Sequence, residues 1–380
     1  MITANPHLRT ISAYAPGATP EQIKAQFGLE HVEKLASNEN PLGCSPAARA
    51  AAIEAIDSVH LYNDGGQILR SRLAEFHGVD AASISVHNGS DAIIHQIMRT
   101  FLLPGETALS SDGTFVSFRL AVASADRTFR TVPLAGGFAY NTPALADAID
   151  ATTKVIYIAN PNNPTGTHVD RQALTSLLDR VPESVLVVLD EAYVEYARHL
   201  HPDTYPSEAE TSRPNVVRLR TFSKAYGLAS LRVGYAVGHP DVMQWLIRTK
   251  LPFDPNGVGC AAAVAALEDQ DFVRRTVELN AECLSIMSAA ATDSGLHAVA
   301  SSANFMMVDL ASNEAATKFH RNLLEGGFIS RPLASFGLPT GVRISTGTLE
   351  QTQRLAELLR SGIGNPSLTL SSSSVHHTTV

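Results

Sequence analysis

The sequence predicts an α/β protein: a large domain with a mostly parallel central sheet covered by helices, and a smaller α+β domain after it. Two observations predict this. From residue 83 onward, short and nearly continuous apolar runs alternate with segments that have helical spacing. Strands that are apolar along their whole length are typical of parallel sheets buried on both faces. After Gly257 this alternation gives way to long alanine- and leucine-rich stretches with fewer strands.

The individual elements follow from local patterns. Ser45 before Pro46 is typical of a helix start, and the alanine-rich stretch after it predicts a helix to about residue 57. Further helices are expected at 67–76, 91–101, 170–178, 261–291, 314–324 and 349–359. Strands are expected at 84–86, 107–109, 128–132, 155–158, 185–189, 216–219, 234–237, 304–310, 328–330 and 342–344.

These elements suggest four parts of the chain. Residues 1–44 are rich in turn formers and are expected to pack on the small domain and the active site. Residues 45–260 form the large domain and residues 261–363 the small one. The serine- and threonine-rich end, 364–380, is expected to be a disordered tail.

Composition excludes several classes of function. The 380 residues are 44% hydrophobic and carry a formal net charge of −8, which argues against nucleic-acid binding because that needs a basic face. No apolar run is long enough to span a bilayer, and no secretory signal is apparent. The three cysteines, Cys44, Cys260 and Cys283, fit reduced thiols in the cytoplasm, and no histidine pattern indicates a metal site.

The segment 220–234 contains the residue on which the functional interpretation depends. Lys224 lies between two strand-like runs, among small residues, two hydroxyls and Arg232. Thr221, Ser223 and Arg232 could hold a phosphate while Lys224 stays close to a carbonyl carbon. An amine in a dry or cationic setting loses its proton more easily and can form a Schiff base. Taken alone, the composition of this segment favours a solvated loop lysine at 224, and the rest of the chain reverses that interpretation.

Other polar groups recur where strands end, the edge at which open α/β sheets bind ligands. Ser90 and Asp91 open a helix whose N-terminus could face an anion, although both are also ordinary cap residues. Phe115 offers an aromatic face or fills the core. Asn163 lies in a stiff Pro/Asn/Gly turn. Asp190 ends an apolar strand, where it either meets a cation or caps the strand.

In this order the pieces resemble the fold-type I pyridoxal-phosphate aminotransferases over nearly the whole chain. The resemblance rests on Asn-Pro-Thr-Gly at 163–166, Asp-x-x-Tyr at 190–193, and Ser-Lys at 223–224 with an arginine eight residues later. It implies that Lys224 binds the cofactor as a Schiff base and later moves a proton. It implies that Asp190 faces the pyridine nitrogen and that Asn163 and Tyr193 hydrogen-bond the phenolic oxygen.

The same resemblance assigns the remaining cofactor contacts. Phe115 would stack on the ring. Tyr62 would reach the phosphate from the neighbouring subunit, which makes a homodimer part of the active site. The other phosphate contacts would be Ser90, Asp91, Thr221, Ser223 and Arg232.

A narrower resemblance is to the histidinol-phosphate aminotransferase family. It rests on the segments 36–43, 62–65, 330–333, 337–339 and 342–348. It implies that Arg331 and Arg343 bind the phosphate of histidinol phosphate in one half-reaction and the carboxylates of glutamate in the other, since the arginine fork suits both anions. Tyr14 and Asn40 would be further substrate-side residues. Each arginine alone could also be a surface salt-bridge partner.

The sequence departs from this family at Asn63, His87, Ser230 and Asp254. None of these removes a cofactor contact, but they leave the substrate open. The leading interpretation is a cytoplasmic, homodimeric aminotransferase that acts on histidinol phosphate and 2-oxoglutarate. Alternatives are an aromatic amino-acid aminotransferase, a decarboxylase, cyclase or lyase on the same scaffold, and a non-catalytic, cofactor-sensing regulator domain.

Overall fold

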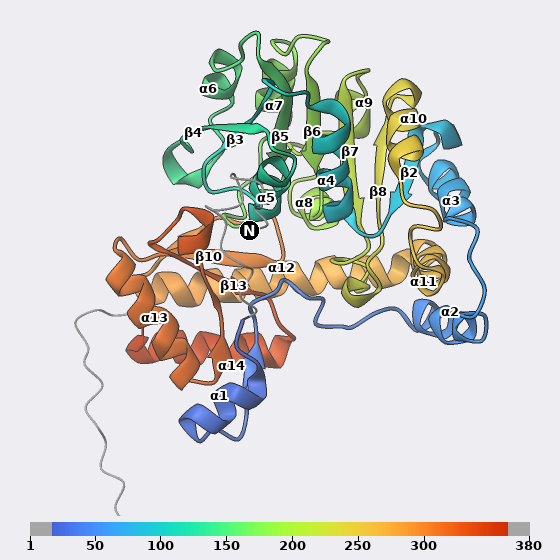
Figure 1. Cartoon of the computed structure of the whole chain (residues 1–380). Coiled ribbons are helices and arrows are strands. Elements are labelled where there is room, and N and C mark those ends of the chain that lie inside the picture. The colour runs from blue at the N-terminus through green and yellow to red at the C-terminus, as the bar shows by residue number, and fades with distance from the viewer. Residues whose placement is uncertain (1–16, 364–380) are drawn as a thin grey trace, which may run out of the picture.

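A seven-stranded sheet forms the centre of the computed structural model, which describes residues 17–363 (Figure 1). The strand order is β2-β8-β7-β6-β5-β3-β4, and β8 runs antiparallel to both of its neighbours while the other pairs are parallel. The strands are β2 (Ile84–His87), β3 (Thr107–Ser111), β4 (Thr128–Val132), β5 (Thr153–Ala159), β6 (Leu186–Asp190), β7 (Val216–Thr221) and β8 (Gly234–Gly238). The expected mostly parallel sheet is confirmed.

Alternate residues of the central strands pack on opposite faces of this sheet. Tyr157 and Val188 pack with α4 (Ser90–Phe101), α5 (Val116–Ser124) and α10 (Pro240–Thr249). Ile158 and Leu189 pack on the other face with α6 (Thr142–Asp147) and α7 (Arg171–Leu178). Because successive strand residues point to opposite faces, both layers need apolar side chains, which explains the unbroken apolar runs in the sequence.

The C-terminal part is built on a smaller sheet with the order β12-β13-β10-β9, all antiparallel. Its strands are β9 (His297–Val299), β10 (Phe305–Asp309), β12 (Arg331–Pro332) and β13 (Gly341–Ser345). The apolar faces of α12 (Gln270–Asp293), α13 (Asn313–Glu325) and α14 (Leu349–Leu358) pack against it. Antiparallel strands and helices thus occur together in this part of the chain, the combination that the α+β prediction describes.

One expectation for this region was wrong. The single helix expected at 261–291 is two helices, α11 (Gly257–Glu268) and α12, which meet at Asp269. The side chain of Asp269 accepts a hydrogen bond from the Phe272 N–H at 3.1 Å and so caps the start of α12. An aspartate within an alanine-rich stretch therefore acts here as a helix N-cap rather than as a helix-interior residue.

The N-terminal segment contacts the C-terminal part before the chain enters the large sheet. After α1 (Pro20–Phe27), β1 (Glu33–Lys34) pairs in parallel with β11 (Phe328–Ile329). The chain then forms α2 (Pro46–Ile56) and α3 (Gln67–His77), while α8 (Val194–Leu200) and α9 (Glu208–Thr211) lie between β6 and β7. Across residues 17–363, no helix combines the length and apolar character needed to cross a membrane.

Candidate active site

A pocket of about 190 Å³ opens where several strands of the large sheet end. The residues around it come from the ends of β5, β6 and β7 and from the loops and helix starts that follow β2, β3, β5, β6 and β7. They are Ser90, Asp91, Phe115, Ala159, Pro161, Asn163, Asp190, Ala192, Tyr193, Thr221, Ser223, Lys224 and Arg232. Apart from Ala159, Pro161 and Ala192, all of these were expected at the site from the sequence. The structure brings them together in one hollow although they are far apart in the sequence.

Lys224 is half-buried just beyond the end of β7. Its Nζ donates long hydrogen bonds to the carbonyl oxygens of Ser37 at 3.3 Å and Asn38 at 3.4 Å. Removal from water, together with the charge of Arg343, lowers the pKa of Lys224 to about 8. A lysine amine that deprotonates this readily is a competent nucleophile towards a carbonyl, unlike a solvated loop lysine.

Asp190 ends β6 and is only 5% exposed. Its Oδ2 accepts a hydrogen bond from the Tyr157 hydroxyl at 2.7 Å, and its Oδ1 accepts one from the Ala192 N–H at 3.2 Å. Burial nevertheless raises the pKa of Asp190 to about 6. The hydrogen bond from Ala192 makes Asp190 a strand-end cap, which was one of the two alternatives expected from the sequence. A nearby cation would still stabilise the charged form of this carboxylate further.

Tyr193 and Asn163, each held by a hydrogen bond, form part of the pocket wall. The Tyr193 hydroxyl accepts a hydrogen bond from the Asn38 side chain at 2.9 Å, and the Lys224 Nζ lies 5.8 Å from the centre of the Tyr193 ring. The Asn163 side-chain oxygen accepts a hydrogen bond from Arg343. Phe115 is the N-cap residue of α5, half-buried at the pocket.

The opposite end of the pocket has the features of an anion site. α4 begins at Ser90, and its N-cap residue, Gly89, provides no side chain to accept from the free N–H groups of the first turn. A Cβ added at Gly89 would lie 2.8 Å from Arg232 Nη2, so the guanidinium rests directly against the start of α4. Free helix N–H groups beside a guanidinium attract a phosphate or carboxylate.

The hydroxyls at this end come from the segment before Lys224. The Thr221 hydroxyl accepts from the Ser223 N–H at 3.1 Å, and Arg232 Nη1 lies 3.5 Å from the Ser223 hydroxyl. Asp91 differs from its neighbours because its carboxylate accepts a hydrogen bond from the Ser117 hydroxyl. Only the backbone N–H of Asp91 is therefore suited to an anion. With an amine, a buried acid and this anion site in one hollow, the residues fit pyridoxal phosphate.

Arg331 and Arg343 do not line this pocket but lie beside it on the small sheet. They are directly paired across β12 and β13, which puts both side chains on the same face. The Arg343 guanidinium lies over the Phe305 ring at 5.2 Å and donates to the Ala36 carbonyl at 2.8 Å.

The other expected residues lie elsewhere. Asn40 donates to the carbonyl of Ala225 at 2.9 Å and to the Thr276 hydroxyl at 3.1 Å, contacts that fix the backbone next to Lys224. Tyr62 is 82% exposed and stacks on Phe253 with ring centres 4.2 Å apart. Tyr14 lies outside the described residues, as does the expected tail at 364–380.

Sequence reasoning missed two residues of this site. Tyr157 was assigned only to a buried strand, although a hydroxyl inside an apolar run signals that it needs a polar partner. Asn38 was noted only as a member of the segment 36–43, with no role of its own. Its backbone φ of 54° places it in the left-handed region, and its side chain orients Tyr193. Neither contact follows from a local pattern.

Comparison with known proteins agrees with this geometry. Residues 30–359 match the family model described as aminotransferase class I and II. The chain is 41% identical to histidinol-phosphate aminotransferase of Geobacillus sp. (strain WCH70), covering 93% of this chain and 96% of that protein. It is 39% identical to histidinol-phosphate aminotransferase of Bacillus subtilis (strain 168), covering 93% and 98%. A crystal structure of the Sinorhizobium meliloti histidinol-phosphate aminotransferase in complex with pyridoxal-5'-phosphate superposes with a TM-score of 0.84 at 31% identity, covering 95% and 97%.

Proposed function

We propose that this chain, which belongs to the class I and II aminotransferase family, transfers the amino group of L-histidinol phosphate to 2-oxoglutarate, with pyridoxal phosphate as cofactor. The products are imidazole-acetol phosphate and glutamate. The observation that carries the proposal is the pairing of Lys224 with Asp190 in one pocket. The pKa of the amine is lowered to about 8, and the acid is buried at the end of the neighbouring strand.

Pyridoxal phosphate, when bound, supplies an electron-accepting ring that stabilises negative charge on the substrate carbon losing its proton. Lys224 would attach the cofactor through Nζ and, once displaced by the substrate amine, take the proton from the substrate Cα. Asp190 would keep the ring nitrogen protonated, and the positive charge it faces would lower its own raised pKa. Tyr193 and Asn163 would donate hydrogen bonds to the phenolic oxygen.

The anion end of the pocket would fix the position of the cofactor. Arg232, the hydroxyls of Thr221 and Ser223, and the N–H groups of Ser90 and Asp91 are the groups suited to its phosphate. Phe115 would pack against the ring. Holding the cofactor at both ends would fix its position relative to Lys224, which is how positioning contributes to rate.

The substrate assignment depends on Arg331 and Arg343. Their cross-strand pairing concentrates positive charge close to Lys224, whose pKa the charge of Arg343 helps to lower. A phosphate in one half-reaction and a carboxylate in the other would suit these two guanidinium groups, because each anion can be bound through bidentate contacts. The names of the relatives support histidinol phosphate as the phosphate-bearing donor.

A homodimer would complete the site. Tyr62 is 82% exposed and stacks on the exposed ring of Phe253, and its chain neighbour Leu61 is exposed as well. An exposed apolar surface of this kind is typical of a subunit interface. A second copy covering it could receive the Tyr62 hydroxyl at its cofactor phosphate. The three cysteines are unpaired, which supports a reducing, cytoplasmic setting.

The test is amino-donor screening of the purified holoenzyme. We expect a visible absorption band that borohydride reduction and Lys224→Ala both abolish. Histidinol phosphate should be preferred strongly over phenylalanine in kcat/KM, because a site built for a phosphate discriminates against analogues that lack it. A preference for phenylalanine would contradict the substrate assignment and indicate an aromatic amino-acid aminotransferase. Release of CO2 without a need for 2-oxoglutarate would contradict transamination and indicate a decarboxylase.

The dimer has its own test. Sedimentation of the wild-type protein should give twice the chain mass, and Leu61→Asp should give a monomer, since burying a charge in an apolar interface is costly. Mixing two inactive variants, Tyr62→Ala and Lys224→Ala, should restore part of the activity. In mixed dimers one site then receives both intact residues. Absence of any restored activity would contradict the shared site.

A further inference from the structure

A second cluster of charged residues lies behind the pocket, at the ends of the same two strands. Asp190 and Thr221 line the pocket, whereas Glu191 follows the first and Arg220 precedes the second. Neighbouring residues of an extended chain point to opposite sides. Within β7, Leu219 packs on the α4 side of the sheet, so Arg218 and Arg220 point to the other side.

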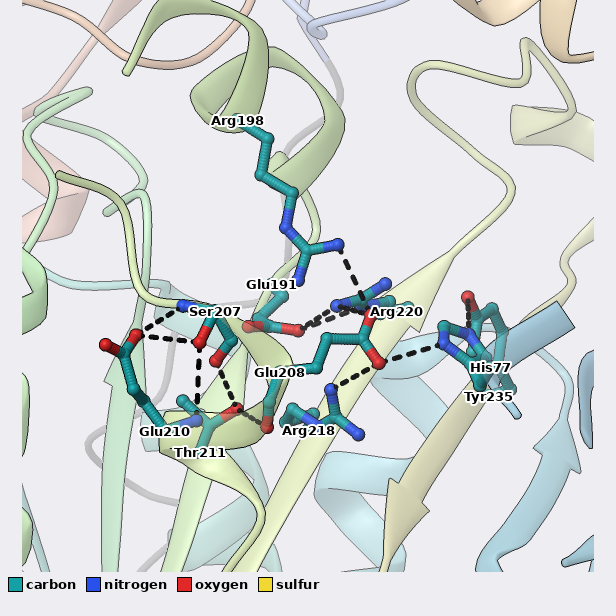
Figure 2. Close-up of polar contacts among 10 residues, drawn as sticks. All are labelled: His77, Glu191, Arg198, Ser207, Glu208, Glu210, Thr211, Arg218, Arg220 and Tyr235. Carbon is teal, nitrogen blue, oxygen red and sulfur yellow. Dashed lines mark hydrogen bonds and ion pairs between the residues drawn. The ribbon is translucent and has the colours of Figure 1, made fainter. Parts of the chain in front are cut away.

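Arg220 and Glu191 form the core of this cluster. Arg220 Nε donates to Glu191 Oε2 at 2.9 Å, and Arg220 Nη2 lies 2.8 Å from the same oxygen (Figure 2). The Nη2 contact is an ion pair rather than an aligned hydrogen bond. Their side chains are only 4% and 3% exposed. At this depth the pair is screened very little by water, so its geometry is held firmly.

Glu208 of α9 completes the cluster from the connection between β6 and β7. Its Oε1 lies 3.0 Å from Arg220 Nη2, and its Oε2 lies 2.9 Å from Arg218 Nη1 (Figure 2). The ring of His77 bridges Glu208 at 3.2 Å and the Tyr235 hydroxyl at 3.0 Å. Burial alone would raise the pKa of Glu208, but the hydrogen bond from His77 and the charges of Arg220 and Arg218 hold it well below its usual value.

The position of the Glu191–Arg220 pair in the two strands is what gives it a role. The Glu191 N–H bonds the Leu219 carbonyl at 2.9 Å, the last rung between the ends of β6 and β7. Beyond it the chain after β7 remains bonded on its other side, where β8 lies, since the Phe222 N–H donates to the Val233 carbonyl at 3.0 Å. The side-chain pair thus joins the two strand ends where the backbone ladder stops and the functional residues begin.

We propose that Glu191 and Arg220 are positioning residues whose ion pair fixes the separation between Asp190 and Lys224. This inference rests on the proposed function, which gives those two residues their tasks. Replacing buried ion pairs by apolar residues of similar volume is often neutral for stability, whereas removing one partner is not. A role in positioning and a role in stability can therefore be separated by comparing single and double variants.

The experiment compares four purified holoenzymes with the wild type. They are Glu191→Gln, Arg220→Met, the double variant Glu191→Leu with Arg220→Met, and the control Arg213→Met. The control removes an arginine that precedes β7 and pairs with Asp179 at 2.7 Å. This pair lies at the start of the strand, whereas the pocket lies at its end. For each we measure thermal unfolding, kcat and KM, and the pH midpoint of the visible absorption band.

Both single variants should lower kcat by at least about tenfold with a smaller change in KM, because a small misplacement of reacting groups is costly. They should also shift the pH midpoint in the same direction. The double variant should recover thermal stability but not kcat or the midpoint. Arg213→Met should match the wild type in kcat and midpoint.

Three results would overturn the inference. These are a double variant with wild-type kcat, single variants that lose stability but keep the wild-type midpoint, and midpoint shifts of opposite sign. Opposite signs would mean that the charges act on Asp190 directly, without a change in position. A wild-type protein with no visible band would instead refute the proposed function, so the two failures are distinguishable.

Discussion

Replacing Lys224 by methionine should stabilise the cofactor-free protein. Burial lowers the pKa of Lys224 from 10.5 to about 8, so keeping the amine charged in the folded state is unfavourable. Each unit of pKa shift corresponds to about 1.4 kcal/mol of stability. Because water in the pocket screens part of this effect, the cost of the charged amine is at most about 3 kcal/mol. Methionine has a similar length and no charge. We therefore expect Lys224→Met to raise the free energy of unfolding by up to about 3 kcal/mol near pH 7.

The pH dependence gives this prediction its sign. Because the folded pKa lies below the unfolded one, the stabilising contribution of the neutral amine is present above 10.5 and is lost as pH falls through about 8. The advantage of Lys224→Met should therefore shrink to about 1 kcal/mol near pH 10. Urea unfolding of the cofactor-free proteins, at equal concentration and at both pH values, measures the difference.

Lys34→Met is the matched control for this experiment. Lys34 is exposed and pairs with Glu39 on the surface at 2.7 Å, so its removal should change stability by less than about 1 kcal/mol at either pH. A Lys224→Met variant that is no more stable than the wild type near pH 7 would refute the reasoning. So would an advantage that stays constant up to pH 10.

Three further changes test other parts of the site. Tyr157→Phe removes the hydroxyl that donates to Asp190, so the pKa of Asp190 should rise and the acidic limb of the kcat profile should move to higher pH; an unchanged limb would contradict the assigned role of Asp190. Arg343→Lys should lower kcat/KM about 10- to 100-fold for both the phosphate-bearing donor and 2-oxoglutarate, because a point charge replaces a bidentate fork; steady-state kinetics with each substrate measures this, and a loss for one substrate only would show that the anions bind at different places. Gly89→Ala should weaken cofactor binding, measured by titration of the cofactor-free protein, because its Cβ would lie 2.8 Å from Arg232 Nη2 and its φ is +89°; wild-type affinity would show that Arg232 can move without cost.

Much of the fold was predictable because local patterns and tertiary packing agree. The apolar run at 128–132 corresponds to β4, and Ser45 with Pro46 marks the start of α2. The prediction of one helix over 261–291 failed because the helical spacing of apolar residues continues across Asp269. That spacing does not reveal that the Asp269 side chain caps the start of a second helix. The direction of β8 was also beyond local patterns, since strand direction depends on the connections.

Less of the site was predictable in detail. Family resemblance named the residues around the pocket, because Lys224 and Asp190 lie in recognisable strand-end segments. It could not show that Asp91 has its carboxylate occupied by Ser117, or that Asn40 supports the backbone beside Lys224. Such contacts join elements that are distant in the sequence, and side-chain direction within a loop has no fixed period that a pattern could reveal.

The two central groups of the pocket are both held in environments that disfavour their charged forms. Burial raises the pKa of Asp190 to about 6 and lowers that of Lys224 to about 8. Each shift is a cost to the protein without its cofactor, and each would be relieved by it, since the ring nitrogen would offer Asp190 a cation and the aldehyde would take up the amine of Lys224. Cofactor binding and folding would then be coupled through the same two residues. The Glu191–Arg220 pair would carry this coupling into the sheet, because it fixes the strand ends on which both groups stand.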